Sequence, residues 1–269
     1  MKIALIPWDD SIRNNSIFYE KYKGYVDPHI LLKKAFEDVH VELNTVDLYR
    51  DLGEVDCFLF FTLNYTWLRR VIKKGGLNKA IYCSGEPHVV KPENSKEGYR
   101  KLLKIFPFIM TWNDDLIDNE RIFIRNIPYH FVKHYGKVPF SERKLLTNIS
   151  GNKRSKQPFE LYSEREKVIS FFERNYPDEF DLYGVGWNAK EHPSYKGIAE
   201  SKIDVYHKYK FALSLENTYN VRGYVTEKLP DCFVTGIVPI YKGASNIDDY
   251  VPRNCYINYD DFGSLEELA

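Results

Sequence analysis

The chain has 269 residues, 43% of them hydrophobic, and its 38 basic residues balance its 38 acidic ones. That length suits one large domain or two of roughly 100–150 residues. The zero net charge argues against bulk nucleic-acid binding, which needs a basic face. No apolar run approaches the ~18 residues that a membrane-spanning helix needs, so none is predicted.

Four cysteines (Cys57, Cys83, Cys232 and Cys255) lie far apart and form no CxxC motif. This spacing indicates reduced, mostly buried thiols, as in a cytosolic protein, and neither a disulfide framework nor a zinc site. The N-terminal sequence MKIALIPWDD contains only a short apolar run, too short for the core of a signal peptide. The predicted location is therefore the cytoplasm, of a bacterial or viral system.

The first half of the chain alternates between predicted strands and helices. The near-continuous apolar run 55–61 is typical of a buried parallel strand. Thr66 can cap a helix that ends at Gly75-Gly76. Strands are predicted at 2–7, 41–46, 55–61, 80–83, 108–111 and 122–125, and helices at 28–36 and 66–74.

Residues 136–158 are rich in Pro, Gly, Ser and basic residues, and beyond them the alternation restarts. Ser163 with Glu166 predicts a capping box for a helix over 163–175. The other elements predicted here are strands at 144–149, 180–183, 211–215 and 237–241 and a helix at 201–209. The fold class is therefore α/β, with Rossmann-like domains over 1–140 and 141–269 that face each other across a cleft.

The segment 209–243 gives the strongest functional signal. An apolar strand runs into Glu216 and Asn217, and after a loop Tyr224 precedes Thr226-Glu227-Lys228, which open a helix. In α/β domains, ligands bind beyond the carboxyl ends of strands and at helix N-termini. A carboxylate, an amide, a phenol and a lysine in that position can hold a sugar attached to a nucleoside diphosphate.

Each of these residue types suggests a role. The first turn of a helix and Lys228 suit an anionic diphosphate. Phosphate would repel Glu227, which is better suited to accept hydrogen bonds from a ribose diol. Taken alone, Glu227 and Lys228 could be an ordinary helix acid and a surface lysine, and Glu216-Asn217 could be a buried structural network. Their combination favours a ligand site.

Two further cations are candidates for the same phosphates. Arg165 lies near the start of the helix predicted at 163–175, where a guanidinium could bridge diphosphate oxygens. The alternative is an exposed helical arginine paired with a glutamate. Lys196, between Tyr195 and Gly197, is a weaker candidate.

Glu86 is the candidate general base of the first half. It follows a predicted buried strand and lies between Gly85, which permits close approach of a ligand, and Pro87. The alternatives are a simple loop glutamate or His88 as the base. We predict no metal site, because the paired acids are typical of turns and helix caps: Asp9-Asp10, Asp114-Asp115, Asp248-Asp249 and Asp260-Asp261.

These residues resemble the α-1,3/4-fucosyltransferases of glycosyltransferase family 10, whose pattern runs YKF-x-L-x-FEN, YVTEK and VP-x-x-x-G. The corresponding residues here are Tyr209-Lys210-Phe211, Leu215-Glu216-Asn217, the run 224–228, and Val238-Pro239 with Gly243. Leu215 replaces the usual Phe. The match is dense over about 55 residues, and in the first half it depends on little more than Ser84-Gly85-Glu86-Pro87.

The resemblance implies a GT-B fold and GDP-fucose as the donor co-substrate, with no cofactor and no metal. It implies inverting transfer of L-fucose to a glycan hydroxyl, by default O3 of GlcNAc in a lactosamine-type glycan, giving an α-1,3-fucoside. It also implies that Glu86 is the general base. The implied donor contacts are Arg165 and Lys228 on the diphosphate, Glu227 on the ribose, and Asn217 and Tyr224 near the fucose and pyrophosphate.

Two other functions remain open on the sequence alone: a GT-B enzyme that uses another nucleotide sugar in polysaccharide assembly, and a non-catalytic carbohydrate-binding relative. Ser264 and Glu267 form a capping box with few residues after it, so we expect a terminal helix that is cut short. The family's later C-terminal helices and heptad-repeat tail are missing from this sequence. Peripheral membrane association would depend on such a tail.

Overall fold

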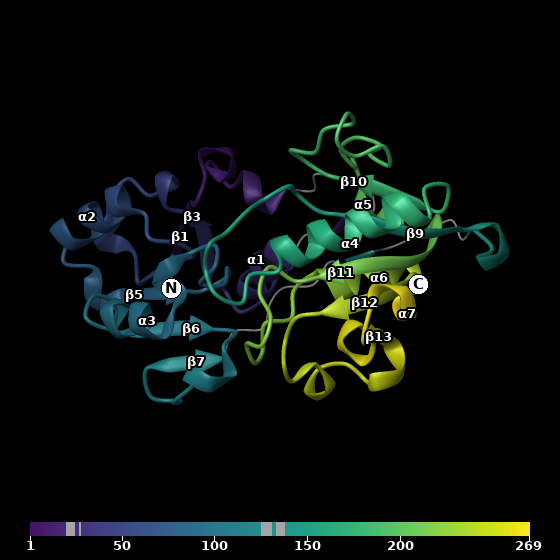
Figure 1. Ribbon diagram of the computed structural model, residues 1–269. Helices are drawn as coiled ribbons and strands as arrows, with labels where there is room; N and C mark the ends of the chain where they lie inside the picture. The colour runs from purple at the N-terminus through teal and green to yellow at the C-terminus, as the bar shows by residue number, and fades with distance from the viewer. Residues whose placement is uncertain (20–24, 27, 125–130, 133–137) are drawn as a thin grey trace. The chain divides into compact units, whose positions relative to one another are not determined.

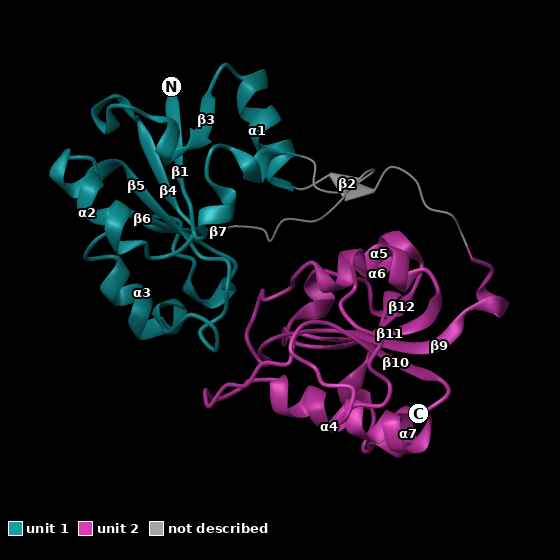
Figure 2. Ribbon diagram, turned by 90° about the horizontal axis from the view of Figure 1, so that it is seen from above, with its two compact units in different colours: residues 1–133 teal, residues 134–269 magenta. Residues whose placement is uncertain are grey.

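The computed structural model describes residues 1–19, 25–26, 28–124, 131–132 and 138–269. The chain divides into two compact units, Met1–Lys133 and His134–Ala269 (Figure 2). The boundary predicted between residues 140 and 141 lies inside the second unit, near its start. Among the described residues, no helix is long and apolar enough to cross a membrane.

Unit 1 is built on a six-stranded parallel sheet with the order β3-β1-β4-β5-β6-β7 (Figure 1). All six strands were predicted, and their bounds are β1 Lys2–Ile6, β3 Glu42–Thr45, β4 Cys57–Phe60, β5 Ala80–Cys83, β6 Phe108–Thr111 and β7 Ile122–Ile124. The helices of this unit are α1 Pro28–Asp38, α2 Tyr65–Lys73 and α3 Lys96–Leu102. The short α3 was not predicted.

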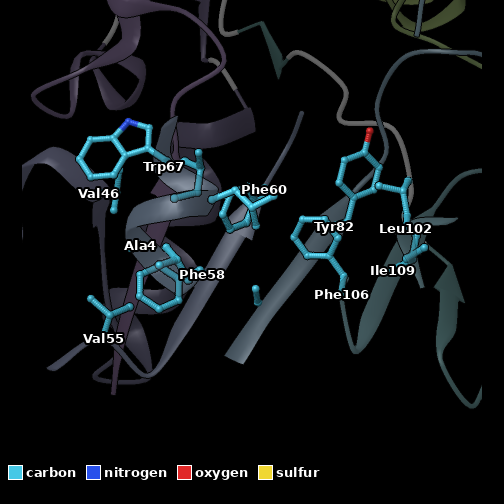
Figure 3. Packing of buried hydrophobic residues seen from close by; sticks show 14 of the residues in the cluster. Ala4, Val46, Val55, Phe58, Phe60, Trp67, Tyr82, Leu102, Phe106 and Ile109 are labelled. Atoms are coloured by element: carbon cyan, nitrogen blue, oxygen red, sulfur yellow. The ribbon is translucent and has the colours of Figure 1, made fainter. Parts of the chain in front are cut away.

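Both faces of this sheet are apolar, which explains why its strands read as continuous hydrophobic runs. Alternate residues point to opposite faces. One face carries Phe58, Phe60 and Tyr82, which pack with α2 and with Phe106 (Figure 3). Phe106 lies 5.2 Å from Phe60 and 5.5 Å from Tyr82 between ring centroids. The other face carries a second buried cluster that includes Ile3, Leu5, Leu59 and Cys83.

Helix α2 starts one residue earlier than predicted, and its cap is different. The predicted cap was Thr66, but the Asn64 side chain accepts a hydrogen bond from the Trp67 amide at 3.2 Å. An N-cap side chain must reach an amide two or three residues on, and Asn64 has that spacing. The helix ends at Lys73, one residue before the predicted end, and Gly75 follows in the left-handed region at φ 69°, as expected for a terminating glycine.

Unit 2 is built on a five-stranded parallel sheet with the order β10-β9-β11-β12-β13. Its strands are β9 Lys144–Ile149, β10 Phe180–Tyr183, β11 Tyr209–Leu215, β12 Val238–Lys242 and β13 Ile257–Asn258. Its helices are α4 Tyr162–Asn175, α5 Lys202–Tyr206, α6 Lys228–Thr235 and α7 Leu265–Leu268. A separate antiparallel pair joins β2 (Tyr25–Val26) to β8 (Phe131–Val132).

The predicted capping box of α4 is wrong. The Glu160 carboxylate caps the helix by accepting hydrogen bonds from the amides of Tyr162 at 2.7 Å and Ser163 at 3.1 Å. Ser163 is already inside the helix. Half of the predicted capping box of α7 is confirmed, because Ser264 accepts a hydrogen bond from the Glu267 amide at 3.3 Å. The Glu267 carboxylate accepts its bond from the Gly263 amide at 2.7 Å instead of from the Ser264 amide.

The described cysteines form no disulfide with one another, and Cys83 and Cys232 are buried. Cys57 is partly buried, whereas Cys255 is exposed.

Candidate functional site

The carboxyl end of β11 and the start of α6 are joined by the side chain of Glu216. This carboxylate is fully buried, at 0% exposure. It accepts hydrogen bonds from the Thr226 amide (2.9 Å) and hydroxyl (2.7 Å) and from the Lys228 amine (2.7 Å). A buried charge is tolerated when it is paired and hydrogen-bonded in this way. Glu216 therefore positions the first turn of α6.

Lys228 is the charged partner and is less buried. Its side chain is 19% exposed, and its amine also donates to the Thr226 hydroxyl at 2.9 Å. The amine is held by two oxygens, and the side chain as a whole remains partly exposed. It can therefore meet an anion at the N-terminus of α6, where the free amides and the helix dipole also favour negative charge.

Gly243 makes room for this arrangement. A Cβ at this position would lie 2.6 Å from Cγ of Glu216 and 2.5 Å from the hydroxyl oxygen of Tyr241. Such distances are too short for any side chain larger than hydrogen. The last glycine of the VP-x-x-x-G motif therefore has a steric role, which is to let β12 turn away close to the buried carboxylate.

Glu227 lies beside a lysine that the sequence did not single out. The Lys202 amine is 3.4 Å from Glu227 and 3.3 Å from the buried Asp231. Burial opposes ionisation of Glu227, but the charges of Lys228 and Lys202 outweigh it and hold its pKa well below the usual range. The ionised carboxylate is an acceptor suited to a diol. The only local signal for Lys202 is its place after Ser201, the N-cap of α5.

Arg165 lies beneath the same strand end. It is 4% exposed, and its Nη2 donates to the carbonyls of Leu215 (2.8 Å) and Glu216 (3.0 Å). Its Nε is buried without a hydrogen-bond partner among the described residues. Burial lowers the pKa of the guanidinium. The alternative of an exposed arginine paired with a glutamate is therefore wrong.

Asn217 and Tyr224 complete the cluster. The Asn217 carbonyl accepts a hydrogen bond from the Leu161 amide at 3.1 Å, which ties the loop before α4 to the end of β11. Tyr224 is buried and close enough to Arg165 to interact with its charge. The structure thus brings Arg165, Glu216, Asn217, Tyr224, Glu227 and Lys228 together at the carboxyl edge of the sheet of unit 2.

Lys196 lies elsewhere. Its amine is 3.4 Å from Asp181, which also accepts hydrogen bonds from Lys144 (2.8 Å) and from the Tyr209 hydroxyl (2.6 Å). Lys144 and Tyr209 are the first residues of β9 and β11, so this cluster lies toward the amino end of the sheet. Lys196 is drawn there because its amide bonds to the Leu182 carbonyl at 2.8 Å. The structure does not bring it to the other predicted site residues.

Glu86, in unit 1, follows β5 in an exposed bend. Its carbonyl accepts a hydrogen bond from the buried Asn94 side chain at 2.6 Å, and Asn94 in turn accepts one from the Tyr82 hydroxyl at 2.8 Å. Asn94, which the sequence did not point to, therefore anchors the backbone of the Glu86 loop to the core. His88, the rival base, lies half-buried in the same loop.

Within the described part of the chain, no three His, Cys, Asp or Glu side chains are grouped so that they could hold a metal ion. Several of the paired acids have structural partners. Asp9 caps a short 3-10 helix through the Ser11 amide at 2.7 Å. Asp260 and Asp261 form ion pairs with Lys242 and Arg253.

Comparison with known proteins identifies the second unit. Residues 143–269 match the sequence model of the glycosyltransferase family 10 (fucosyltransferase) C-terminal domain. That segment, a little under half of the chain, belongs to glycosyltransferase family 10. It contains all of the clustered residues described above.

Relatives agree with this assignment over part of their length. An α-(1,4)-fucosyltransferase of Arabidopsis thaliana is 54% identical over 61 residues, 23% of this chain and 15% of that protein. The 4-galactosyl-N-acetylglucosaminide 3-α-L-fucosyltransferase 9 of Cricetulus griseus is 42% identical over 135 residues, 49% of this chain and 33% of that protein. These alignments thus span a third or less of the relatives' length.

Solved structures extend the likeness to both units. An α1,3-fucosyltransferase matches 99% of this chain and 75% of its own, with a TM-score of 0.64 and 15% identity. The same kind of enzyme crystallised with GDP-fucose gives a TM-score of 0.58 at 17% identity. The Anabaena protein HepE, crystallised with UDP and glucose, matches 100% of this chain and 88% of its own, with a TM-score of 0.54 and 9% identity. The predicted GT-B fold is confirmed.

Proposed function

We propose that this protein transfers L-fucose from GDP-fucose to a hydroxyl group of a glycan. The observation that carries the proposal is the cluster around Glu216 and Lys228 in the family 10 unit. A structural neighbour of this chain was crystallised with GDP-fucose, which supports this donor.

In this proposal the diphosphate binds at the N-terminus of α6. Lys228, already fixed by Glu216, contacts the phosphate oxygens together with the free amides of the helix. The guanidinium of Arg165, bonded to the carbonyls of Leu215 and Glu216, adds a second positive charge for the diphosphate at the same strand end. Glu227 accepts hydrogen bonds from the ribose hydroxyls, and Asn217 and Tyr224 lie near the fucose and the pyrophosphate.

The reaction we propose is a single displacement that inverts the anomeric carbon. The acceptor oxygen forms a bond to C1 of fucose while the bond from C1 to the β-phosphate oxygen breaks, and the β-linked donor becomes an α-fucoside. Glu86 takes the proton of the acceptor hydroxyl. The negative charge that develops on GDP is stabilised by Lys228, Arg165 and the helix N-terminus, most strongly in the transition state. These groups supply the charge that a metal ion would otherwise supply.

We propose O3 of GlcNAc in a lactosamine-type glycan as the acceptor. The names of the fucosyltransferase 9 relatives describe transfer to position 3 of such a unit, while the Arabidopsis relative is named for position 4. In this proposal the acceptor contacts loops of the first half, which lies outside the family 10 match.

A second candidate is a GT-B enzyme with another nucleotide sugar, because HepE shares the fold and was crystallised with UDP and glucose. A donor panel of GDP-fucose, GDP-mannose and UDP-sugars, with N-acetyllactosamine as acceptor and NMR assignment of the linkage, tests the proposal. Transfer from GDP-fucose that persists in EDTA is expected. Transfer from UDP-sugars alone would refute the donor, and donor binding without transfer or hydrolysis would indicate a non-catalytic relative.

A further inference from the structure

Three aromatic rings meet at the carboxyl edge of the sheet of unit 1. Trp8 follows β1, Phe61 follows β4, and His29 lies in the first turn of α1. The centroid of the Trp8 ring is 5.7 Å from that of Phe61 and 5.7 Å from that of His29. Trp8 nevertheless remains 43% exposed. The two neighbours hold the ring in place, and part of the residue faces solvent.

The backbone next to Trp8 is anchored. The carbonyl of Pro7 accepts a hydrogen bond from the Asn64 side chain at 3.1 Å, and the same side chain caps α2. Asn64 is followed by Tyr65, which is 63% exposed. The hydrogen bond between Pro7 and Asn64 therefore brings the backbones of Trp8 and Tyr65, the residues that follow them, close together at this edge.

Trp8 and Glu86 both come after the carboxyl ends of strands of this sheet. Ile6, Phe60 and Tyr82 form one row across β1, β4 and β5 in the strand register. Trp8 comes two residues after Ile6, and Glu86 comes four residues after Tyr82. The ends of β1 and β5 are two strand spacings apart, about 10 Å, and a disaccharide is of comparable length.

The geometry points to a carbohydrate subsite on Trp8, with Tyr65 at its margin, that holds the sugar next to the one attacked. A pyranose has an apolar C–H face and a polar rim of hydroxyl groups. A fixed indole offers a flat apolar surface for that face, and a tyrosine adds a hydroxyl for the rim. This inference deepens the proposed function and depends on it: Glu86 serves the reacting sugar, and Trp8 holds its neighbour.

The test compares Trp8→Ala and Trp8→Phe with the wild-type protein, using N-acetyllactosamine and the single sugar GlcNAc as acceptors. Trp8→Ala should raise the KM for the disaccharide about threefold to tenfold and leave that for GlcNAc nearly unchanged. Trp8→Phe should recover most of the loss. Phe108→Ala is the matched control, because Phe108 is 41% exposed in the same unit but begins β6, at the opposite edge.

Saturation-transfer NMR of the disaccharide, without donor, gives a second readout that does not require transfer. Loss of the signal in Trp8→Ala but not in Phe108→Ala supports the subsite even if the wild-type protein transfers no fucose, in which case the proposed function alone fails. An unchanged disaccharide KM in Trp8→Ala, an equal loss for both acceptors, or no disaccharide binding to the wild-type protein would overturn the inference. Circular dichroism and thermal denaturation show whether each variant is folded, and neither depends on nucleotide binding.

Discussion

The Lys228 amine lies 2.7 Å from a carboxylate oxygen of Glu216, at the point where β11 gives way to the loop before α6. Glu216 is fully buried and Lys228 is not, so the two partners differ in what they can do. Glu216 holds the local fold, and Lys228 is held by it at the edge where a ligand can bind.

Removal of Lys228 should destabilise the protein. Lys228→Ala leaves the Glu216 charge buried without its ammonium partner, so we expect the free energy of unfolding to fall by about 3–5 kcal/mol. Urea denaturation measures this. Lys167→Ala is the control, since its 3.1 Å pair with Glu164 involves a largely exposed lysine and should contribute less than about 1 kcal/mol. Equal losses in the two variants would contradict the role of the buried pair.

GDP binding should distinguish the two lysines predicted from the sequence. Calorimetry should show clearly weaker GDP binding in a folded Lys228 variant, and Lys228→Met, which keeps much of the side-chain volume, limits the loss of packing. Lys196→Ala should bind GDP like the wild-type protein, because its amine is paired with Asp181 toward the amino end of the sheet. Weaker GDP binding in Lys196→Ala would mean that this lysine leaves Asp181 when the nucleotide binds.

Glu86→Gln should separate binding from turnover. The amide cannot take the acceptor proton, so kcat should fall about 10²–10⁴-fold while the Kd for GDP-fucose stays nearly constant. Steady-state kinetics and calorimetry provide the two values. His88→Ala tests the rival base in the same loop. Near-wild-type turnover in Glu86→Gln, together with a large loss in His88→Ala, would transfer the role to the histidine.

Gly243→Ala should disturb the site without removing any polar group. The added methyl would lie 2.6 Å from Glu216 and 2.5 Å from Tyr241, and the overpacking should cost about 1–3 kcal/mol and weaken GDP binding. Gly151→Ala is the matched control, since its methyl would have no contact closer than 3.7 Å. The prediction fails if thermal denaturation cannot tell the two variants apart.

Glu227 should make stability depend on pH in the acid range. Its pKa in the folded protein lies well below the ordinary value of 4.5. A depressed pKa gives stability that is complete above the unfolded-state pKa and is lost as the pH falls from there toward the folded-state pKa. The difference in unfolding free energy between wild type and Glu227→Gln should therefore be constant from pH 8 to about 5.5 and shrink below about 4.5. If this difference in unfolding free energy stayed independent of pH down to about 3.5, the lowered pKa of Glu227 would be contradicted.

The sequence alone determined the α/β alternation and most of the site residues. Strand periodicity is a local property, so β5, β6, β9 and β10 were predicted with their observed bounds. A short sequence motif predicted the site residues Glu216, Glu227 and Lys228, because the residues that define the motif are close together in the chain.

Only the tertiary structure decided what these residues touch. Arg165 is buried under the carbonyls of β11, and Lys202 pairs with Glu227, although each pair is separated by many residues of chain. Asn94 anchors the Glu86 loop, and Lys196 pairs with Asp181 away from the cluster. Such contacts depend on which strands lie side by side in a sheet. Strand order is set by burial summed over a whole unit, and no short stretch of sequence contains it.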